Sequence, residues 1–360
     1  MPLFGRAKAR PPLAETHADR ICIIKPSALG DVVQTLPVLT ALRVRFPRAY
    51  IAWVVNRAYA DVLAGHPDLD EVIAFDRIRE APWSRPVRRS LAELRATLRS
   101  RRFDLAIDVQ GLLRSGLMTW ATGAARRVGL GDAREGASLC YTDKIAVPAE
   151  NISAVDRYWL VASALGAGNT AKQFRIALED DDRAWAGERL AAATGLRVVI
   201  NAGARWPTKR WPVEHFAVIA GRLVREFDAS IILVGGSEDV PTANQLAASL
   251  PGRAINLAGQ TTLKQLAAVL VGAHLVVTND SGPMHLAAAL GTPVAAIFTC
   301  TSPERARPYG AGHLVFSTNV WCAASYVKRC SRMECMLELT PDRIWPALSA
   351  RLQTLSHRAA

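Results

Sequence analysis

Residues 276–298 read VVTNDSGPMHLAAALGTPVAAIF, and this stretch contains the alternation that a parallel α/β sheet requires. An apolar strand ends in the polar pair Asn279 and Asp280. A helix is then expected after Ser281, because serine is a favoured helix cap and Pro283 suits the first helical position. A second apolar strand closes the stretch. Short apolar strands joined through helices predict a parallel sheet with both faces covered.

The same alternation extends along the chain in two successive runs. The first run of predicted strands comprises 21–24, 50–55, 71–75 and 105–108, and the second comprises 198–200, 231–234, 254–256, 275–278 and 294–297. A chain of 360 residues exceeds what one core usually supports. We therefore expect an α/β protein with two Rossmann-like domains whose parallel sheets face a central cleft. The expected divisions are a basic flexible tail at 1–19, an N-terminal domain at 20–178, a C-terminal domain at 179–340 and a final helix at 341–360.

The charge of the chain points to an anionic partner. Its formal net charge is +12, and nine arginines lie within 77–102 against only Glu80 and Glu93. Aromatic residues are too sparse in this region for a platform that stacks nucleic-acid bases, so phosphate or anionic lipid fits better. The alternative is a solvated helix face. We expect no nucleic-acid partner.

The six cysteines predict reduced thiols rather than disulfides. The N-terminus lacks the apolar segment of an export signal, so a cytoplasmic location is expected. Cys322, Cys330 and Cys335 cluster but form no C-x-x-C pair, which disfavours a zinc site.

The loop at Asp280 and Ser281 has the composition of an anion site. A helix N-terminus presents backbone N–H groups, and its dipole favours negative charge. His285 lies in the first turn and can face the same anion. The alternative is an ordinary capped helix, which would not need Asn279, Asp280 and His285 beside the cap.

Three further loops follow predicted strands. In KPSALGD, at 25–31, Asp31 either complements the helix dipole or acts as a general base. NAGARWPTKRWP, at 201–212, is either a phosphate-binding turn or a basic surface loop. In VGGSED, at 234–239, glycines let a ligand approach the backbone, and Glu238 can accept hydrogen bonds from a ribose.

In this order, the four loops resemble those of the ADP-heptose:lipopolysaccharide heptosyltransferases of glycosyltransferase family nine. The matching stretches are KPSALGDVVQTLPVLTALR, DVQGLLRSG, NAGARWPTKRWPVEHF, GGSEDV and VVTNDSGPMHLAAALGTPVAAIF. They span most of residues 20–300, and CMLELTPDRIWPAL resembles the closing segment of the family. The resemblance implies a GT-B fold, with the acceptor in the N-terminal domain and the nucleotide sugar in the C-terminal domain. It implies neither a metal nor a nicotinamide cofactor.

The resemblance also implies roles for individual residues. Asp31 falls on the catalytic base, Lys209 on a phosphate-binding lysine, and Glu238 on the acid that contacts the nucleoside of the donor. The donor-binding signature matches Asp280, Ser281, Gly282 and His285. On the acceptor side, the matching or corresponding residues are Ser27, Gly30, Gln110, Gly111, Arg85, Arg88 and Arg89.

The implied function is an inverting transfer of a heptose, or a related sugar, from ADP-heptose to the lipopolysaccharide inner core. The implied partners are ADP-heptose, a phosphorylated core acceptor and the inner face of the cytoplasmic membrane. The alternatives are a related glycosyltransferase that uses another nucleotide sugar or acceptor, a GT-B sugar-nucleotide epimerase, and a non-catalytic binder of anionic glycolipid or nucleic acid.

Two departures from the family pattern leave the acceptor and the sugar open. Cys322-Ala-Ala-Ser325 stands where many relatives carry a C-x-x-C pair, and the run before Lys209 lacks the paired threonines of some heptosyltransferases I.

Overall fold

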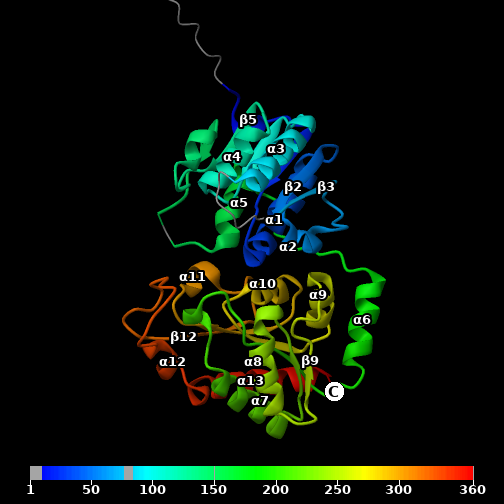
Figure 1. The fold of residues 1–360 in the computed structure, drawn as a ribbon, viewed down its shortest axis with the longest axis vertical. Coiled ribbons are helices and arrows are strands. Elements are labelled where there is room, and N and C mark those ends of the chain that lie inside the picture. Colours follow the sequence, from blue (N-terminus) through cyan, green and yellow to red (C-terminus); the bar gives the residue numbers. More distant parts are fainter. Residues whose placement is uncertain (1–9, 77–83, 150, 360) are drawn as a thin grey trace, which may run out of the picture.

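The computed structural model describes residues 10–76, 84–149 and 151–359. They form two domains, each built on a six-stranded parallel sheet. Figure 1 shows α1 and α2 of the first domain facing α9, α10 and α11 of the second. The strands of the first sheet are β1 Arg20–Ile24, β2 Tyr50–Asn56, β3 Glu71–Phe75, β4 Leu105–Asp108, β5 Arg126–Leu130 and β6 Asp143–Ile145. Those of the second are β7 Arg197–Asn201, β8 Ser230–Leu233, β9 Ala254–Asn256, β10 Leu275–Asn279, β11 Val294–Phe298 and β12 Leu314–Ser317.

Both sheets have the same winding. The first has the order β3-β2-β1-β4-β5-β6, and the second has the order β9-β8-β7-β10-β11-β12 when read from its β9 edge. This is the order of the dinucleotide-binding Rossmann sheet. The strand order reverses between β1 and β4 in one domain and between β7 and β10 in the other, and each such position is a topological switch point. Ligands of open α/β sheets bind at these points, beyond the carboxyl ends of the strands.

Helices cover both faces of each sheet, as the apolar strands predicted. The first half contains α1 Leu29–Arg45, α2 Arg57–Ala60, α3 Arg85–Ser100, α4 Leu113–Ala121 and α5 Ala154–Ala164. The second contains α6 Asp180–Leu190, α7 Val213–Phe227, α8 Val240–Ala248, α9 Leu263–Val271, α10 Gly282–Ala289, α11 Pro303–Ala306, α12 Glu334–Glu338 and α13 Pro341–Ala359. Short 3₁₀ turns complete the fold: η1 Leu13–Glu15, η2 Asp61–Leu63, η3 Ala137–Cys140, η4 Pro207–Lys209 and η5 Ser237–Asp239.

The strand β1 illustrates how the core is built. Ile21 and Ile23 pack with α1 and α5, whereas Cys22 and Ile24 pack with the inner residues of α3 and α4 on the opposite face. The cluster that contains Ile21 continues into the second domain through α1 and α10. The two domains therefore meet at buried apolar contacts.

Three strands were not predicted from the sequence, namely β5, β6 and β12. Part of the predicted flexible tail is also ordered, because η1 lies within it and Arg126 donates hydrogen bonds to Pro11 O and to Thr16 Oγ1. Residues 1–9 lie outside the described ranges. Across the residues that the structure describes, no helix combines the length and apolarity needed to span a membrane.

Candidate active site

The turn between β1 and α1 places Asp31 in the first turn of α1, at the first switch point. Its carboxylate accepts the Ala28 N–H at 3.1 Å, which caps the helix, and its side chain remains 36% exposed. Both interpretations of Asp31 are therefore compatible with its position, since the same carboxylate completes the helix start and remains partly exposed.

Two buried side chains hold Asp31 from behind. The Tyr158 hydroxyl, on α5, donates to Asp31 Oδ1 at 2.6 Å and accepts from Lys25 Nζ at 2.8 Å. Lys25 Nζ also donates to Val109 O and lies 3.6 Å from Asp31 Oδ1. Neither Lys25 nor Tyr158 was predicted from the sequence as a site residue.

These neighbours keep Asp31 ionised. Burial, the largest single influence, acts to raise the pKa of Asp31, but Lys25, the Tyr158 hydroxyl and the Ala28 N–H together hold that pKa below its ordinary value. Burial lowers the pKa of Lys25 and raises the pKa of Tyr158 well above its ordinary value. The result is a carboxylate that is charged at neutral pH and fixed in orientation.

The second switch point contains an ion pair between Lys209 and Asp280. Asp280 follows β10 and is buried, and its Oδ2 atom accepts from Lys209 Nζ at 2.5 Å and from Thr301 Oγ1 at 2.6 Å. Lys209 ends η4, in the loop after β7. The structure thus brings together Lys209 and Asp280, which lie far apart in the sequence.

Ser281 occupies the N-cap position of α10, although its side chain does not cap the helix. Its hydroxyl instead accepts a hydrogen bond of 2.9 Å from Asn201 Nδ2, which joins the ends of β7 and β10. The helix begins at Gly282, with Pro283 in its first turn, as predicted. Its N-terminus therefore opens at the switch point, where an anion is favoured.

The two switch points meet across the domain interface. A Cβ atom on Gly30 would lie 2.4 Å from His285 Cδ2, and one on Gly282 would lie 2.8 Å from Leu29 Cδ2. The N-terminal turns of α1 and α10 are therefore in direct contact. Burial lowers the pKa of His285, so its imidazole is neutral at pH 7. Asp31, Asp280 and His285 line one charged junction between the domains.

The remaining acceptor-side residues lie around the same loop. Gln110 Oε1 accepts the Ser27 N–H at 3.3 Å, and Arg114 Nη2 donates to Ser27 Oγ at 3.2 Å. Gly111 has φ +72°, a conformation that favours glycine, and its N–H donates to the buried Asp108. Ser27 and Gln110 are thus in contact, in the loops that follow β1 and β4.

The arginine-rich segment forms an exposed helix. Arg85, Arg88 and Arg89 lie on the first turns of α3, and Arg89 pairs with Glu93. Arg77 and Arg79 fall outside the described residues. These side chains are accessible to an anionic partner but make no contact with Asp31.

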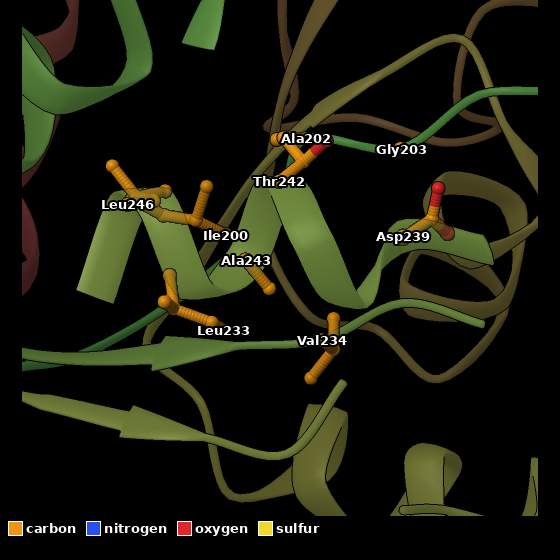
Figure 2. A pocket seen from close by; sticks show the side chains of 9 residues that line it. All are labelled: Ile200, Ala202, Gly203, Leu233, Val234, Asp239, Thr242, Ala243 and Leu246. Carbon is orange, nitrogen blue, oxygen red and sulfur yellow. The ribbon is translucent and has the colours of Figure 1, made fainter. Parts of the chain in front are cut away.

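The loop after β8 contributes a small cavity beside the second switch point. Figure 2 shows Asp239 next to Gly203, with the cavity walled by the ends of β7 and β8 and by α8. The Asp239 carboxylate accepts the Gly236 N–H at 2.9 Å, and burial raises its pKa. Glu238, the residue selected from the sequence, is exposed one position earlier on η5.

Comparison with known proteins agrees with this geometry. The family model described as glycosyltransferase family 9 (heptosyltransferase) matches residues 91–336. The chain belongs to glycosyltransferase family 9. Among its relatives, lipopolysaccharide heptosyltransferase 1 of Pseudomonas aeruginosa is 29% identical, over 92% of this chain and 98% of that protein. Lipopolysaccharide heptosyltransferase 2 of Escherichia coli K12 is 26% identical over the same shares of the two chains.

Solved structures of family 9 members have the same fold. The E. coli heptosyltransferase WaaC with ADP superposes with a TM-score of 0.75 at 28% identity, covering 92% of this chain and 99% of that one. The predicted GT-B fold and family are therefore confirmed. A UDP-N-acetylglucosamine 2-epimerase from Listeria monocytogenes shares the fold with a TM-score of 0.54 at 12% identity. That similarity is one of fold alone and gives the epimerase alternative no further support.

The cysteines are free thiols in the structure. Cys330 is exposed, Cys335 is buried and Cys322 is partly exposed. Within the described ranges, no group of three or more metal-binding side chains comes together.

Proposed function

We propose that the protein is an inverting heptosyltransferase that moves a heptose from ADP-heptose to the lipopolysaccharide inner core. One observation carries the proposal: Asp31, oriented by Tyr158, lies in the first turn of α1, and this turn packs across the domain interface against the first turn of α10. Transfer between two substrates needs a base beside one and positive charge beside the leaving group of the other. The heptosyltransferase relatives support the choice of sugar and acceptor.

Asp31 is the general base of this reaction. It takes the proton from the acceptor hydroxyl, whose oxygen attacks the anomeric carbon from the face opposite the diphosphate. The bond from the anomeric carbon to the diphosphate breaks as the new glycosidic bond forms, through a transition state with oxocarbenium character. ADP leaves with the bonding electron pair, and the proton remains on Asp31.

The leaving diphosphate is stabilised from the C-terminal domain. The α10 N-terminus, with Ser281, Gly282 and His285, offers backbone dipoles, and Lys209 offers a full positive charge. Lys209 also pairs with Asp280, so the diphosphate shares this cation with the Asp280 carboxylate. Glu238, at the mouth of the cavity beside Asp239, binds the nucleoside part of the donor.

The acceptor lies on the side of the N-terminal domain. Ser27, Gly30, Gln110 and Gly111 surround the hydroxyl that Asp31 activates, and the arginines of α3 bind phosphates of the core. Because this acceptor is lipid-linked, the protein works in the cytoplasm, peripherally on the inner face of the inner membrane.

Replacing Asp31 tests the proposal. Asp31→Asn keeps the shape of the side chain but removes the base, so turnover should fall by a factor of about 10²–10⁴. Acceptor-dependent release of ADP from ADP-heptose is the measurement, and ADP affinity should stay close to that of the parent protein. Asp76→Asn, which alters an exposed ion pair with Arg57, is the control and should be fully active. Near-normal turnover by Asp31→Asn would overturn the proposed role.

A further inference from the structure

The outer face of α4 carries large apolar side chains that nothing in the described part of the chain covers. Leu113, Leu117 and Trp120 recur at helical spacing and are 43–51% exposed. Leu139, on the adjoining turn η3, is 87% exposed. The opposite side of α4 is buried at Ser115, Gly116, Met118 and Thr119. A short surface helix with apolar residues outside as well as inside is typical of an interaction site.

Arginines border this apolar stripe on the side of α3. The Arg95 guanidinium lies 5.9 Å from the centre of the Trp120 ring. Arg99 reaches the end of α4, where its Nη1 atom would lie 2.4 Å from a Cβ atom on Gly123. Glu93 is the single acid within α3, and it pairs with Arg89. The stripe is therefore bordered by positive charge on the side of α3, whereas at its start Glu135 accepts the Leu113 N–H.

The stripe is continuous with the acceptor side of the cleft. Helix α4 starts just after the carboxyl end of β4, and its Arg114 contacts Ser27 in the loop that carries Asp31. Figure 1 shows α3 and α4 side by side on one flank of the first domain, in agreement with the contacts between them. A molecule held on this flank lies next to the Ser27 loop, on the proposed acceptor side.

We propose that the α4 face, defined as Leu113, Leu117, Trp120 and Leu139, docks the protein onto an anionic lipid bilayer. Leucine and tryptophan side chains enter the boundary between headgroups and acyl chains, and neighbouring arginines bind lipid phosphates. The apolar side chains of the α4 face thus match the acyl region of a bilayer, and the neighbouring arginines match its phosphate layer. The proposal rests on the proposed function for the presence of a lipid-linked acceptor, but vesicle binding is measured without any transfer reaction.

The test compares two double variants. Leu117→Gln/Leu139→Gln removes two side chains from the α4 face, which are 51% and 87% exposed. Val271→Gln/Leu337→Gln removes two side chains of similar exposure, 47% and 71%, from the C-terminal domain. The full-length protein and both variants are sedimented with vesicles of phosphatidylethanolamine and phosphatidylglycerol, and with vesicles of phosphatidylcholine alone.

We expect the parent protein and the Val271/Leu337 variant to bind the anionic vesicles, and less so as salt rises. Binding by the Leu117/Leu139 variant should fall by about tenfold or more. Its turnover with a water-soluble, deacylated acceptor should be unchanged, which excludes misfolding. Equal binding by both variants, or no binding by the parent protein, overturns the proposal. So does a parent protein that is dimeric by sedimentation and becomes monomeric in the Leu117/Leu139 variant, because the α4 face would then join two copies.

If vesicle binding behaves as expected but no sugar is transferred to any acceptor, the proposed function fails and the docking surface stands. If transfer to the deacylated acceptor proceeds but both variants bind vesicles equally, the docking surface fails alone.

Discussion

The properties of Asp31 are set by residues that no sequence motif connects to it. Lys25 belongs to the same loop, but its almost complete burial could not be read from the sequence. Tyr158 lies 127 positions away, on α5, and reaches Asp31 only because α5 packs against α1. The sequence therefore predicts Asp31 as a candidate base but does not predict the groups that orient its carboxylate.

Removing the Tyr158 hydroxyl should change the pH dependence of the reaction. This hydroxyl helps to hold the pKa of Asp31 below its ordinary value, so Tyr158→Phe should raise that pKa. A general base works only when it is deprotonated. The acidic limb of the kcat/KM profile should therefore move to higher pH, and kcat should fall more than KM for the donor changes.

Tyr141→Phe is the matched control. Tyr141 also donates its hydroxyl to a buried aspartate, Asp108, so the same deletion costs about 1 kcal/mol of stability without touching Asp31. The acidic limb of the kcat/KM pH profile should not move in the Tyr141→Phe variant. If Tyr158→Phe and Tyr141→Phe leave the profile equally unmoved, Tyr158 has only a structural role.

At the scale of elements, the sequence predicted nine strands and missed three, β5, β6 and β12. Strand β5 begins with Arg126 and Arg127, whose side chains are satisfied by Asp143 and by backbone carbonyls. Strands β6 and β12 are short edge strands with mixed burial. Such strands depend on tertiary partners rather than on an apolar run, so periodicity alone does not reveal them.

The contact between α1 and α10 yields a test at this scale. Gly30→Ala places a methyl group against the buried His285 ring, so the two helix N-termini must separate. We expect weaker ADP binding and lower kcat, because the base and the leaving-group site no longer align. Titration calorimetry with ADP and steady-state kinetics measure the two effects.

Gly187→Ala is the control for the same substitution in open space. Gly187 lies within α6, and a Cβ atom there would meet nothing within 4 Å. This variant should be stabilised by about 0.4–1 kcal/mol and keep full activity. Equal activity of both variants would show that the packing of α1 against α10 does not matter for catalysis.

At the scale of the whole molecule, hydrogen bonds between the domains accompany the contact between the two helices. The Asp61 carboxylate of η2 accepts the Lys264 N–H in the first turn of α9, and Arg305 donates to Asn151 Oδ1. The two Rossmann-like domains followed from the two runs of strands, and the GT-B fold followed from the family resemblance. These specific contacts did not, because nothing in either run identifies its partner in the other.

Asp61→Ala should favour an open arrangement of the domains. The lost interaction between a carboxylate and a helix N-terminus contributes about 0.3–1 kcal/mol, which shifts the population of the closed form about two- to fivefold. Small-angle scattering should give a larger radius of gyration without ligand, and saturating ADP should reduce it. Asp342→Ala, which removes an ion pair within one domain, should leave the radius unchanged. An unchanged radius for Asp61→Ala would count against this role of the contact.

The duplicated winding order has a consequence for how the donor is protected. Each half of the molecule has its own switch point, and the proposed base and the proposed leaving-group site lie on different halves. A donor carried by the open molecule has no base beside its anomeric carbon. Stray water thus meets an incomplete reaction centre, and the sugar is committed only after both halves are loaded and brought together. The proposed reaction centre is therefore complete only when both domains contribute to it, which protects the activated sugar from hydrolysis.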